Sequence, residues 1–132
     1  MATKPVVVRE ADLPLETWDD PVRGTVSWRT LFSGDRTPTA GLTMGVAEVR
    51  PEDAGRTTLH RHAHPETYFI LSGRGVLRIN GEDHDLSPGA AAFIPGGALH
   101  GAHAVGDEPL RILYAFAADS FDEVRYEFPA AG

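Results

Sequence analysis

GRTTLHRHAHPE, residues 55–66, is the stretch of this chain that decides its fold. His60 and His62 stand one residue apart, and Glu66 follows four residues after the second histidine. Side chains at positions i and i+2 of a β-strand point to the same face, so we expect both imidazoles to enter one space. A tight turn at residues 63–65 would bring Glu66 back from the neighbouring strand to the same point.

A third imidazole comes later in the chain, where His100 follows the turn signal PGG at residues 95–97. Three imidazoles and one carboxylate suit Mn, Fe, Ni, Zn or Co. Four protein ligands leave coordination positions free on an octahedral ion, whereas a closed structural zinc site leaves none. We therefore predict one reactive divalent metal, with Mn, Fe or Ni favoured over Zn or Co and a structural metal as the alternative. The predicted ligands are His60, His62, Glu66 and His100.

Size and composition limit the class of protein. A length of 132 residues predicts a single domain, 1–132, with an N-terminal arm at about 1–25 and a barrel at about 26–128. The chain has no cysteine, which excludes thiolate metal sites, disulfides and cysteine nucleophiles. The net charge of −7, without any basic cluster, argues against a nucleic-acid partner.

The chain also lacks the sequence features of a membrane or secreted protein. No apolar run approaches the roughly 20 residues that a membrane-spanning helix needs. The first residues lack the apolar core of a signal peptide. We therefore expect a cytoplasmic protein without a membrane partner.

Short strand-like runs, broken by Gly, Pro and Asp at close spacing, predict an all-β sandwich or barrel. The expected strands are residues 26–33, 42–50, 57–62, 66–72, 75–80, 83–86, 90–94, 99–105, 110–117 and 123–128. The pair Asn80-Gly81 predicts a type I′ hairpin turn between two of them. The only helical feature that we expect is a short turn around residues 13–20.

Strand alternation places two tyrosines on the metal side. Tyr68 shares the parity of Glu66, and alternation in residues 123–128 turns Tyr126 inward. A cation near Tyr68 would lower the pKa of its phenol from about 10 and make it a general base. Tyr126 is a candidate second base or carboxylate anchor. The alternative for both is core packing, which is also the role that we expect for Tyr114.

Two separated motifs resemble those of the cupin superfamily. The first is H-x-H-x3-E-x6-G at residues 60–73, and the second is G-x5-P-x-G-x2-H at residues 89–100. Gly55 lies one residue closer to His60 than the usual pattern has it, and Ala104 stands where the second motif ends in Asn. The resemblance implies a double-stranded β-helix, or jelly roll, with the metal inside the barrel.

Four further segments resemble small single-domain dimethylsulfoniopropionate lyases of the cupin type. They are VSWR at 26–29, GLTMGVAE at 41–48, ETY at 66–68 and FDEVRY at 121–126. The resemblance implies that the metal carries the substrate carboxylate, and that a tyrosine two residues after the Glu ligand removes the α-proton. Dimethyl sulfide then leaves as acrylate forms. Tyr68 matches that tyrosine, and Tyr126 matches a second one near the C-terminus.

Other functions stay open from the sequence. An Fe(II) dioxygenase would use the same four ligands, and a non-catalytic cupin that binds a small molecule would need no poised base. In the lyase interpretation the partner is a small carboxylate, and Trp28 would hold a sulfonium by cation–π attraction of about 1–2 kcal/mol, with core packing as its alternative role. Exposed sheet edges and apolar outer faces predict a homodimer.

Overall fold

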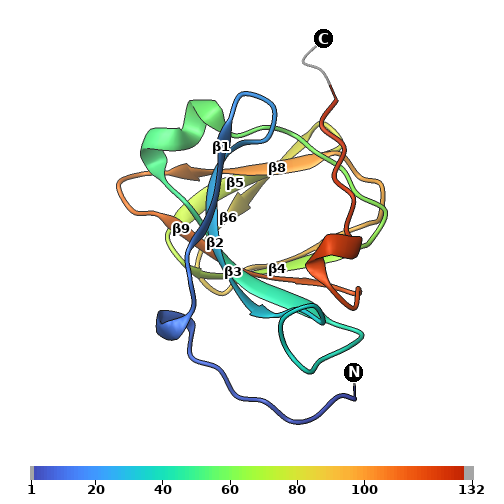
Figure 1. Cartoon of the computed structure of the whole chain (residues 1–132). Coiled ribbons are helices and arrows are strands. Elements are labelled where there is room, and N and C mark those ends of the chain that lie inside the picture. The colour runs from blue at the N-terminus through green and yellow to red at the C-terminus, as the bar shows by residue number, and fades with distance from the viewer. Residues whose placement is uncertain (1, 130–132) are drawn as a thin grey trace.

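Two antiparallel sheets wrap around a common interior in the computed structural model, which describes residues 2–129 (Figure 1). The larger sheet has the strand order β1-β2-β3-β9-β4-β7, and the smaller has the order β6-β5-β8. The strands are β1 (Glu16–Asp20), β2 (Gly24–Phe32), β3 (Thr43–Val49), β4 (Glu66–Ser72), β5 (Arg74–Ile79), β6 (Glu82–Leu86), β7 (Ala91–Ile94), β8 (His100–Val105) and β9 (Leu110–Phe116). Three short 3₁₀ helices join them: η1 (Glu10–Asp12), η2 (Pro51–Arg56) and η3 (Phe121–Glu123). The predicted all-β jelly roll is confirmed.

The interior is filled from alternate positions of the central strands. Along β9 every second side chain is buried, and β4 shows the same alternation, with Ile70 only 1% exposed. One cluster of buried side chains is aliphatic and joins the two sheets through residues such as Ile70, Leu77 and Ile112. A second cluster is aromatic and includes Trp28 and Phe116. Period-2 alternation therefore assigns the inner faces as predicted.

Two predicted strands are wrong as continuous strands. Residues 57–62 follow η2 and form only isolated bridges, His60 with His100 and Arg61 with Glu127. Residues 123–128 begin in η3 and then run extended, with that same bridge at Glu127. The physical reason is that the segment around His60 runs between β8 and the C-terminal segment and meets each at a single residue. A ladder of paired residues therefore does not form.

The helical turn expected at residues 13–20 is also wrong. Residues Glu16–Asp20 form strand β1, which pairs with β2 so that Trp18 lies opposite Val26. The helical turn lies earlier in the chain, at η1. Asp20 ends the strand by accepting hydrogen bonds from the backbone N–H groups of Val22 (2.9 Å) and Arg23 (2.7 Å). That Asx-type turn favours a β1–β2 hairpin over a helix.

The hairpin turn at Asn80-Gly81 is confirmed. Both residues have positive φ angles, 49° and 85°, as a type I′ turn requires. The turn joins β5 to β6 in register, and the acidic arm that follows it is exposed, including His84.

Among residues 2–129, no helix is long and apolar enough to cross a membrane. The cytoplasmic location stays a prediction.

Two glycines with nearly the same backbone angle provide a stability test. Gly73 (φ 80°) lies between β4 and β5, and an added Cβ would sit 2.1 Å from the carbonyl oxygen of Pro109. Gly81 (φ 85°) has open space at the same position. We expect Gly81→Ala to cost about 1–2 kcal/mol of unfolding free energy from backbone strain alone. Gly73→Ala adds a backbone clash of about 1–3 kcal/mol.

The measurement is the urea midpoint of both variants with an unchanged slope. Equal midpoints for Gly73→Ala and Gly81→Ala would contradict the close approach of Pro109.

Candidate metal centre

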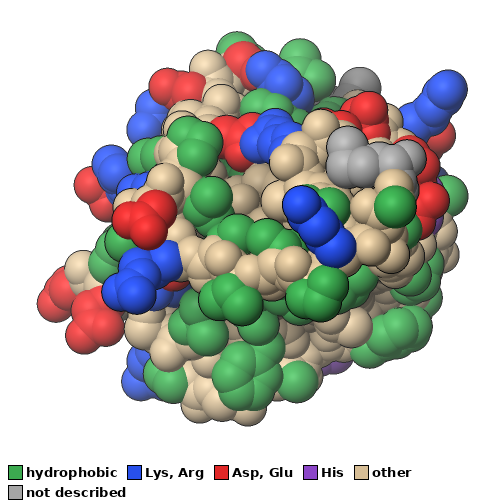
Figure 2. All heavy atoms as spheres, turned by 60° about the horizontal axis from the view of Figure 1, so that its bottom comes forward, with side chains coloured by type: hydrophobic (Ala, Val, Ile, Leu, Met, Phe, Trp, Pro, Cys, Tyr) green, Lys and Arg blue, Asp and Glu red, His purple; other side chains and the backbone are tan. Residues whose placement is uncertain are grey.

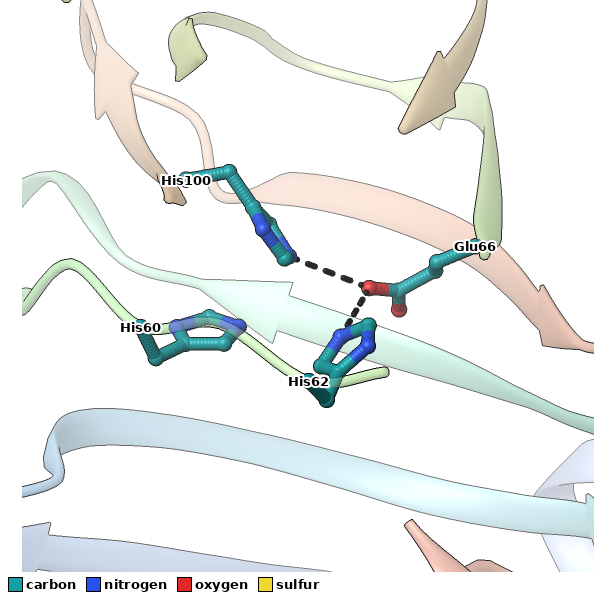
Figure 3. A group of neighbouring side chains, drawn as sticks. All are labelled: His60, His62, Glu66 and His100. Carbon is teal, nitrogen blue, oxygen red and sulfur yellow. Dashed lines mark hydrogen bonds and ion pairs between the residues drawn. The ribbon is translucent and has the colours of Figure 1, made fainter. Parts of the chain in front are cut away.

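The four predicted ligands meet in one space, although they come from three parts of the fold (Figure 3). His60 and His62 lie on the segment after η2, Glu66 begins β4, and His100 begins β8. Their ligand atoms all lie within 4.8 Å of one another. Two backbone hydrogen bonds connect His60 with His100: each backbone N–H donates to the other residue's carbonyl, at 2.9 and 2.8 Å. The fold therefore positions the ligands through the backbone.

Hydrogen bonds on the far side of two rings set their tautomers. The Nδ1 atom of His62 lies 2.8 Å from the carbonyl oxygen of His64, and Nδ1 of His100 lies 2.8 Å from the carbonyl oxygen of Ala98. A carbonyl only accepts hydrogen bonds, so each Nδ1 carries the proton. In the neutral ring Nε2 is then a lone pair directed toward the centre, which is the arrangement typical of metal-bound histidine.

Glu66 faces these two Nε2 atoms at short range. Its Oε1 atom lies 3.1 Å from Nε2 of His62 and 3.2 Å from Nε2 of His100. The two ring nitrogens and the carboxylate oxygen are all atoms that bind divalent metals, and they converge on one point. A cation there would be held by all three, so the residues present fit a divalent metal. The set is buried, with His62 3%, Glu66 4% and His100 0% exposed.

Two pKa shifts agree with a metal-binding role. Burial and the neighbouring His100 lower the pKa of His60 to about 3, so its ring is neutral and has a free lone pair at physiological pH. Burial raises the pKa of Glu66, but the hydrogen bonds from His100 and His62 outweigh it, and the net pKa is lowered. Glu66 is therefore a carboxylate. The centre therefore combines three imidazole rings with one negative charge.

Both candidate tyrosines lie beside this centre. Tyr68 follows Glu66 by two residues on the inner face of β4 and pairs in register with Tyr114 of β9. Tyr126 lies with its ring centroid 5.1 Å from those of His60 and His62. The inward direction predicted for Tyr126 is confirmed, although no continuous strand carries it.

Without a cation the tyrosines are neutral phenols. Burial and the negative charge of Glu66 raise the pKa values of Tyr68 and Tyr126 well above 10. A lower pKa for Tyr68 beside a bound cation stays a prediction.

A cavity of about 90 Å³ opens onto the centre. His60, Glu66, Tyr68 and Tyr126 line one part of it, and the remaining wall is mostly aromatic. The aromatic residues of that wall are Trp18, Trp28, Tyr114 and Phe121. The centre is therefore open to a small molecule and enclosed by rings.

Sequence reasoning missed Trp18, which packs edge-on against Trp28 with ring centroids 5.2 Å apart. The available signal was the alternation in β1, where Thr17 and Asp19 are exposed and Trp18 points inward. Tyr114, expected in packing, is buried but also lines the cavity.

Two further positions have clear structural roles. His64 contacts the site through its backbone, because its carbonyl oxygen accepts the hydrogen bond from His62. Ala104, in the place where the family motif has Asn, is only 4% exposed and belongs to the aliphatic core. The polar contact of that Asn is thus replaced here by apolar packing.

Residues 46–116 match the family model described as Cupin domain, and the chain belongs to the cupin superfamily. It is 39% identical over 127 residues to the dimethylsulfoniopropionate lyase DddW of Ruegeria pomeroyi. The aligned region covers 96% of this chain and 82% of that protein. It is 33% identical over 70 residues to a 5-nitrosalicylic acid 1,2-dioxygenase of a Bradyrhizobium species, over 53% of this chain and 33% of that enzyme. A solved structure of a predicted oxalate decarboxylase from Thermotoga maritima superposes with a TM-score of 0.72 at 26% identity, over 86% of this chain and 99% of that chain.

Removal of one imidazole tests the metal centre. We expect His100→Ala to weaken Mn(II) binding by at least about 100-fold, since even changes outside the ligand shell cost 10–100-fold. Isothermal titration with Mn(II), with the metal content measured after gel filtration, checks this. His84→Ala is the matched control, because His84 is exposed on β6. Equal Mn(II) affinity in both variants would rule out this centre.

Proposed function

We propose that this protein is a metal-dependent lyase that carries out β-elimination on a small carboxylate of the dimethylsulfoniopropionate type. The observation that carries the proposal is the position of Tyr68, which lines the same small cavity as the ligands His60 and Glu66. The identity of 39% over nearly the whole chain to a dimethylsulfoniopropionate lyase supports the same reaction class.

The four ligands would hold one divalent cation, with Mn, Fe or Ni favoured. A cation bound there supplies Lewis-acid chemistry, which makes the C–H bond next to a coordinated carboxylate more acidic. Tyr126 would contact the same carboxylate, which its ring contacts with His60 and His62 support.

Tyr68 is the proposed general base. Its phenolate oxygen takes the proton from the carbon next to the carboxylate. The electrons of that C–H bond form the C=C bond of acrylate, and the C–S bond breaks with its electron pair leaving on neutral dimethyl sulfide. The proton is afterwards lost from Tyr68 to solvent, so the chain is unchanged at the end of the reaction.

The aromatic wall suits the cationic end of such a substrate. Trp28 is 8% exposed and lines the cavity together with Trp18 and Phe121. Aromatic faces attract a sulfonium through the ring quadrupole, and most strongly when water is excluded. The wall also excludes water from the reacting carbons, and the cavity of about 90 Å³ admits only a small substrate.

The direct test is headspace dimethyl sulfide after dimethylsulfoniopropionate is added to Mn-, Fe- and Ni-loaded protein. We expect Tyr68→Phe to lower kcat by about 100-fold or more, because it lacks the general base, while it still binds the metal. Thr67→Val is the matched control: it also removes a hydroxyl from β4, but Thr67 is exposed on the outer face.

Two outcomes would contradict this assignment. Absence of dimethyl sulfide from every loaded form, with the metal confirmed as bound, would reject the substrate. Equal rates in Tyr68→Phe and Thr67→Val would reject Tyr68 as the base.

A substitution at Trp28 tests whether the aromatic wall binds the sulfonium group of the substrate. Loss of a cation–π contact of about 1–2 kcal/mol predicts that Trp28→Leu raises KM for dimethylsulfoniopropionate by roughly 5- to 30-fold. Inhibition by 4-methylpentanoate, an uncharged-tail isostere with the same carboxylate, should change much less. An equal loss for both molecules would show that Trp28 only shapes the cavity.

An Fe(II) dioxygenase is the second candidate, supported by the 5-nitrosalicylic acid 1,2-dioxygenase relative. The same ligand set suits iron. Substrate-dependent O₂ uptake by the Fe(II) form, without dimethyl sulfide release, would favour this candidate over the lyase.

A further inference from the structure

A second cavity lies beside the one that opens onto the metal centre. It has a volume of about 80 Å³, and the two cavities share five lining residues. The shared residues are Trp18, Val26, Ala47, His60 and Tyr68. We call the second space the rear cavity and the first the front cavity. Both spaces therefore reach a metal ligand and the proposed base.

The two cavities differ in the chemistry of their walls. The front cavity lies in the aromatic cluster, whereas Val49, Ala102 and Ile112 extend the rear cavity into the aliphatic cluster. Ile112 is 2% exposed and Val49 is 5% exposed, so this wall is closed to solvent. Enclosed apolar cavities in proteins bind small apolar molecules such as xenon. The rear cavity is thus suited to a small molecule without charge.

Charge separates the two cavities further. Glu66 lines the front cavity, but none of the described residues that line the rear cavity is acidic. The guanidinium of Arg23 borders the rear cavity and lies over the ring of Trp18, 5.0 Å from the ring centroid. A sulfonium entering the rear cavity would find no negative partner and a cation already stacked on Trp18. A neutral molecule meets neither obstacle.

The outer end of the rear cavity reaches the surface. Three residues, Thr25, Thr57 and Thr58, line both the rear cavity and a surface groove of about 430 Å³. This groove lies between the β1–β2 turn and η2, which are neighbours in the fold (Figure 1). Residues 57–58 belong to no helix or strand. A small molecule that leaves on this side does not pass the aromatic wall of the front cavity.

The proposed reaction changes which cavity suits the sulfur group. Before the C–S bond breaks, the sulfonium is held by the aromatic wall around Trp28. Afterwards the sulfide is neutral, so its cation–π attraction is lost while its apolar surface still favours burial. Acrylate keeps its carboxylate and therefore its contacts in the front cavity. The neutral product is the one that the aliphatic wall of the rear cavity suits.

We propose that the rear cavity is a binding site for a small neutral dialkyl sulfide. It receives the dimethyl sulfide formed at Tyr68 and releases it past Thr57 and Thr58. The identity of this ligand rests on the proposed function. The preference of the cavity for a small apolar molecule rests on its walls alone.

Binding is tested by methyl NMR of the full chain loaded with Zn, which is diamagnetic. The chain has four isoleucines, and Ile112 lines the rear cavity. Ile94 is 0% exposed and lies outside that lining, so its methyl signal is an internal reference. Addition of dimethyl sulfide, or of xenon as a second probe, should shift the Ile112 signal in a saturable way and leave the Ile94 signal unchanged.

A substitution that fills the rear cavity provides the variant. Ala102 shares the inner face of β8 with His100 and lines the rear cavity but not the front one. Ala102→Leu should weaken dimethyl sulfide binding by at least about 10-fold, as expected when methylene groups occupy an apolar pocket. Ala102→Val is the milder variant if the larger side chain prevents folding. Ala117→Leu is the matched control, because Ala117 is exposed after β9.

This pair of variants also separates the cavity from the surface. Hydrophobic side chains are exposed beside charged ones on the outside of the molecule (Figure 2). Adsorption there would persist in Ala102→Leu, whereas binding in the rear cavity would not. An Ile112 shift that does not saturate, or that is unchanged in both Ala102 variants, would overturn the proposal.

Inhibition by added dimethyl sulfide gives a second readout with the Mn-loaded protein. A sulfide in the rear cavity leaves the front cavity free, so kcat should fall while KM for dimethylsulfoniopropionate stays unchanged. Ala102→Leu should lose this inhibition, and Ala117→Leu should keep it. Competitive inhibition would place the sulfide in the front cavity and overturn the proposal. A saturable Ile112 shift in a wild type that forms no dimethyl sulfide would instead reject the proposed reaction and support the apolar site.

Discussion

The convergence of imidazole side chains on one buried carboxylate is the constraint on which the rest of this structure depends. His62 and His100 each commit their Nδ1 proton to a backbone carbonyl, so that both Nε2 atoms face the carboxylate of Glu66 at hydrogen-bond distance. Burial makes such an arrangement costly unless a cation lies at its centre. The paired backbone hydrogen bonds between His60 and His100 prevent the set from relaxing apart.

The ligands could be predicted from the sequence because their spacing acts locally. His60 and His62 share a face even though they lie in no continuous strand, since two extended residues are enough to align them. Tyr126 shows the same effect: the burial alternation of residues 124–128 holds without a ladder. Local alternation does not predict which distant segments pair. Residues 57–62 and 123–128, both predicted as strands, meet their neighbours only at single bridges.

The cavity wall was harder to predict for a related reason. Trp18 reaches the site only because Asp20 turns the chain back on itself and pairs β1 with β2. In the sequence, the run around Trp18 is short and acidic, and no alternation long enough to predict a strand surrounds it. The lining of a cavity depends on which strands become neighbours, whereas the ligand set depends on spacing within a few residues. The sequence therefore predicts the metal ligands better than it predicts the residues that would determine substrate specificity.

The strand β4 carries apolar side chains on both of its faces. Its inner face presents Glu66, Tyr68 and Ile70 to the interior, and its outer face presents Phe69 and Leu71 to solvent. A strand with apolar residues on both faces is typical of a sheet that is covered on both sides. The interior covers one side of β4 and the arm stops short of the other. The strand that carries a metal ligand and the proposed base is therefore held by packing on its inner side and is open to solvent on its outer side.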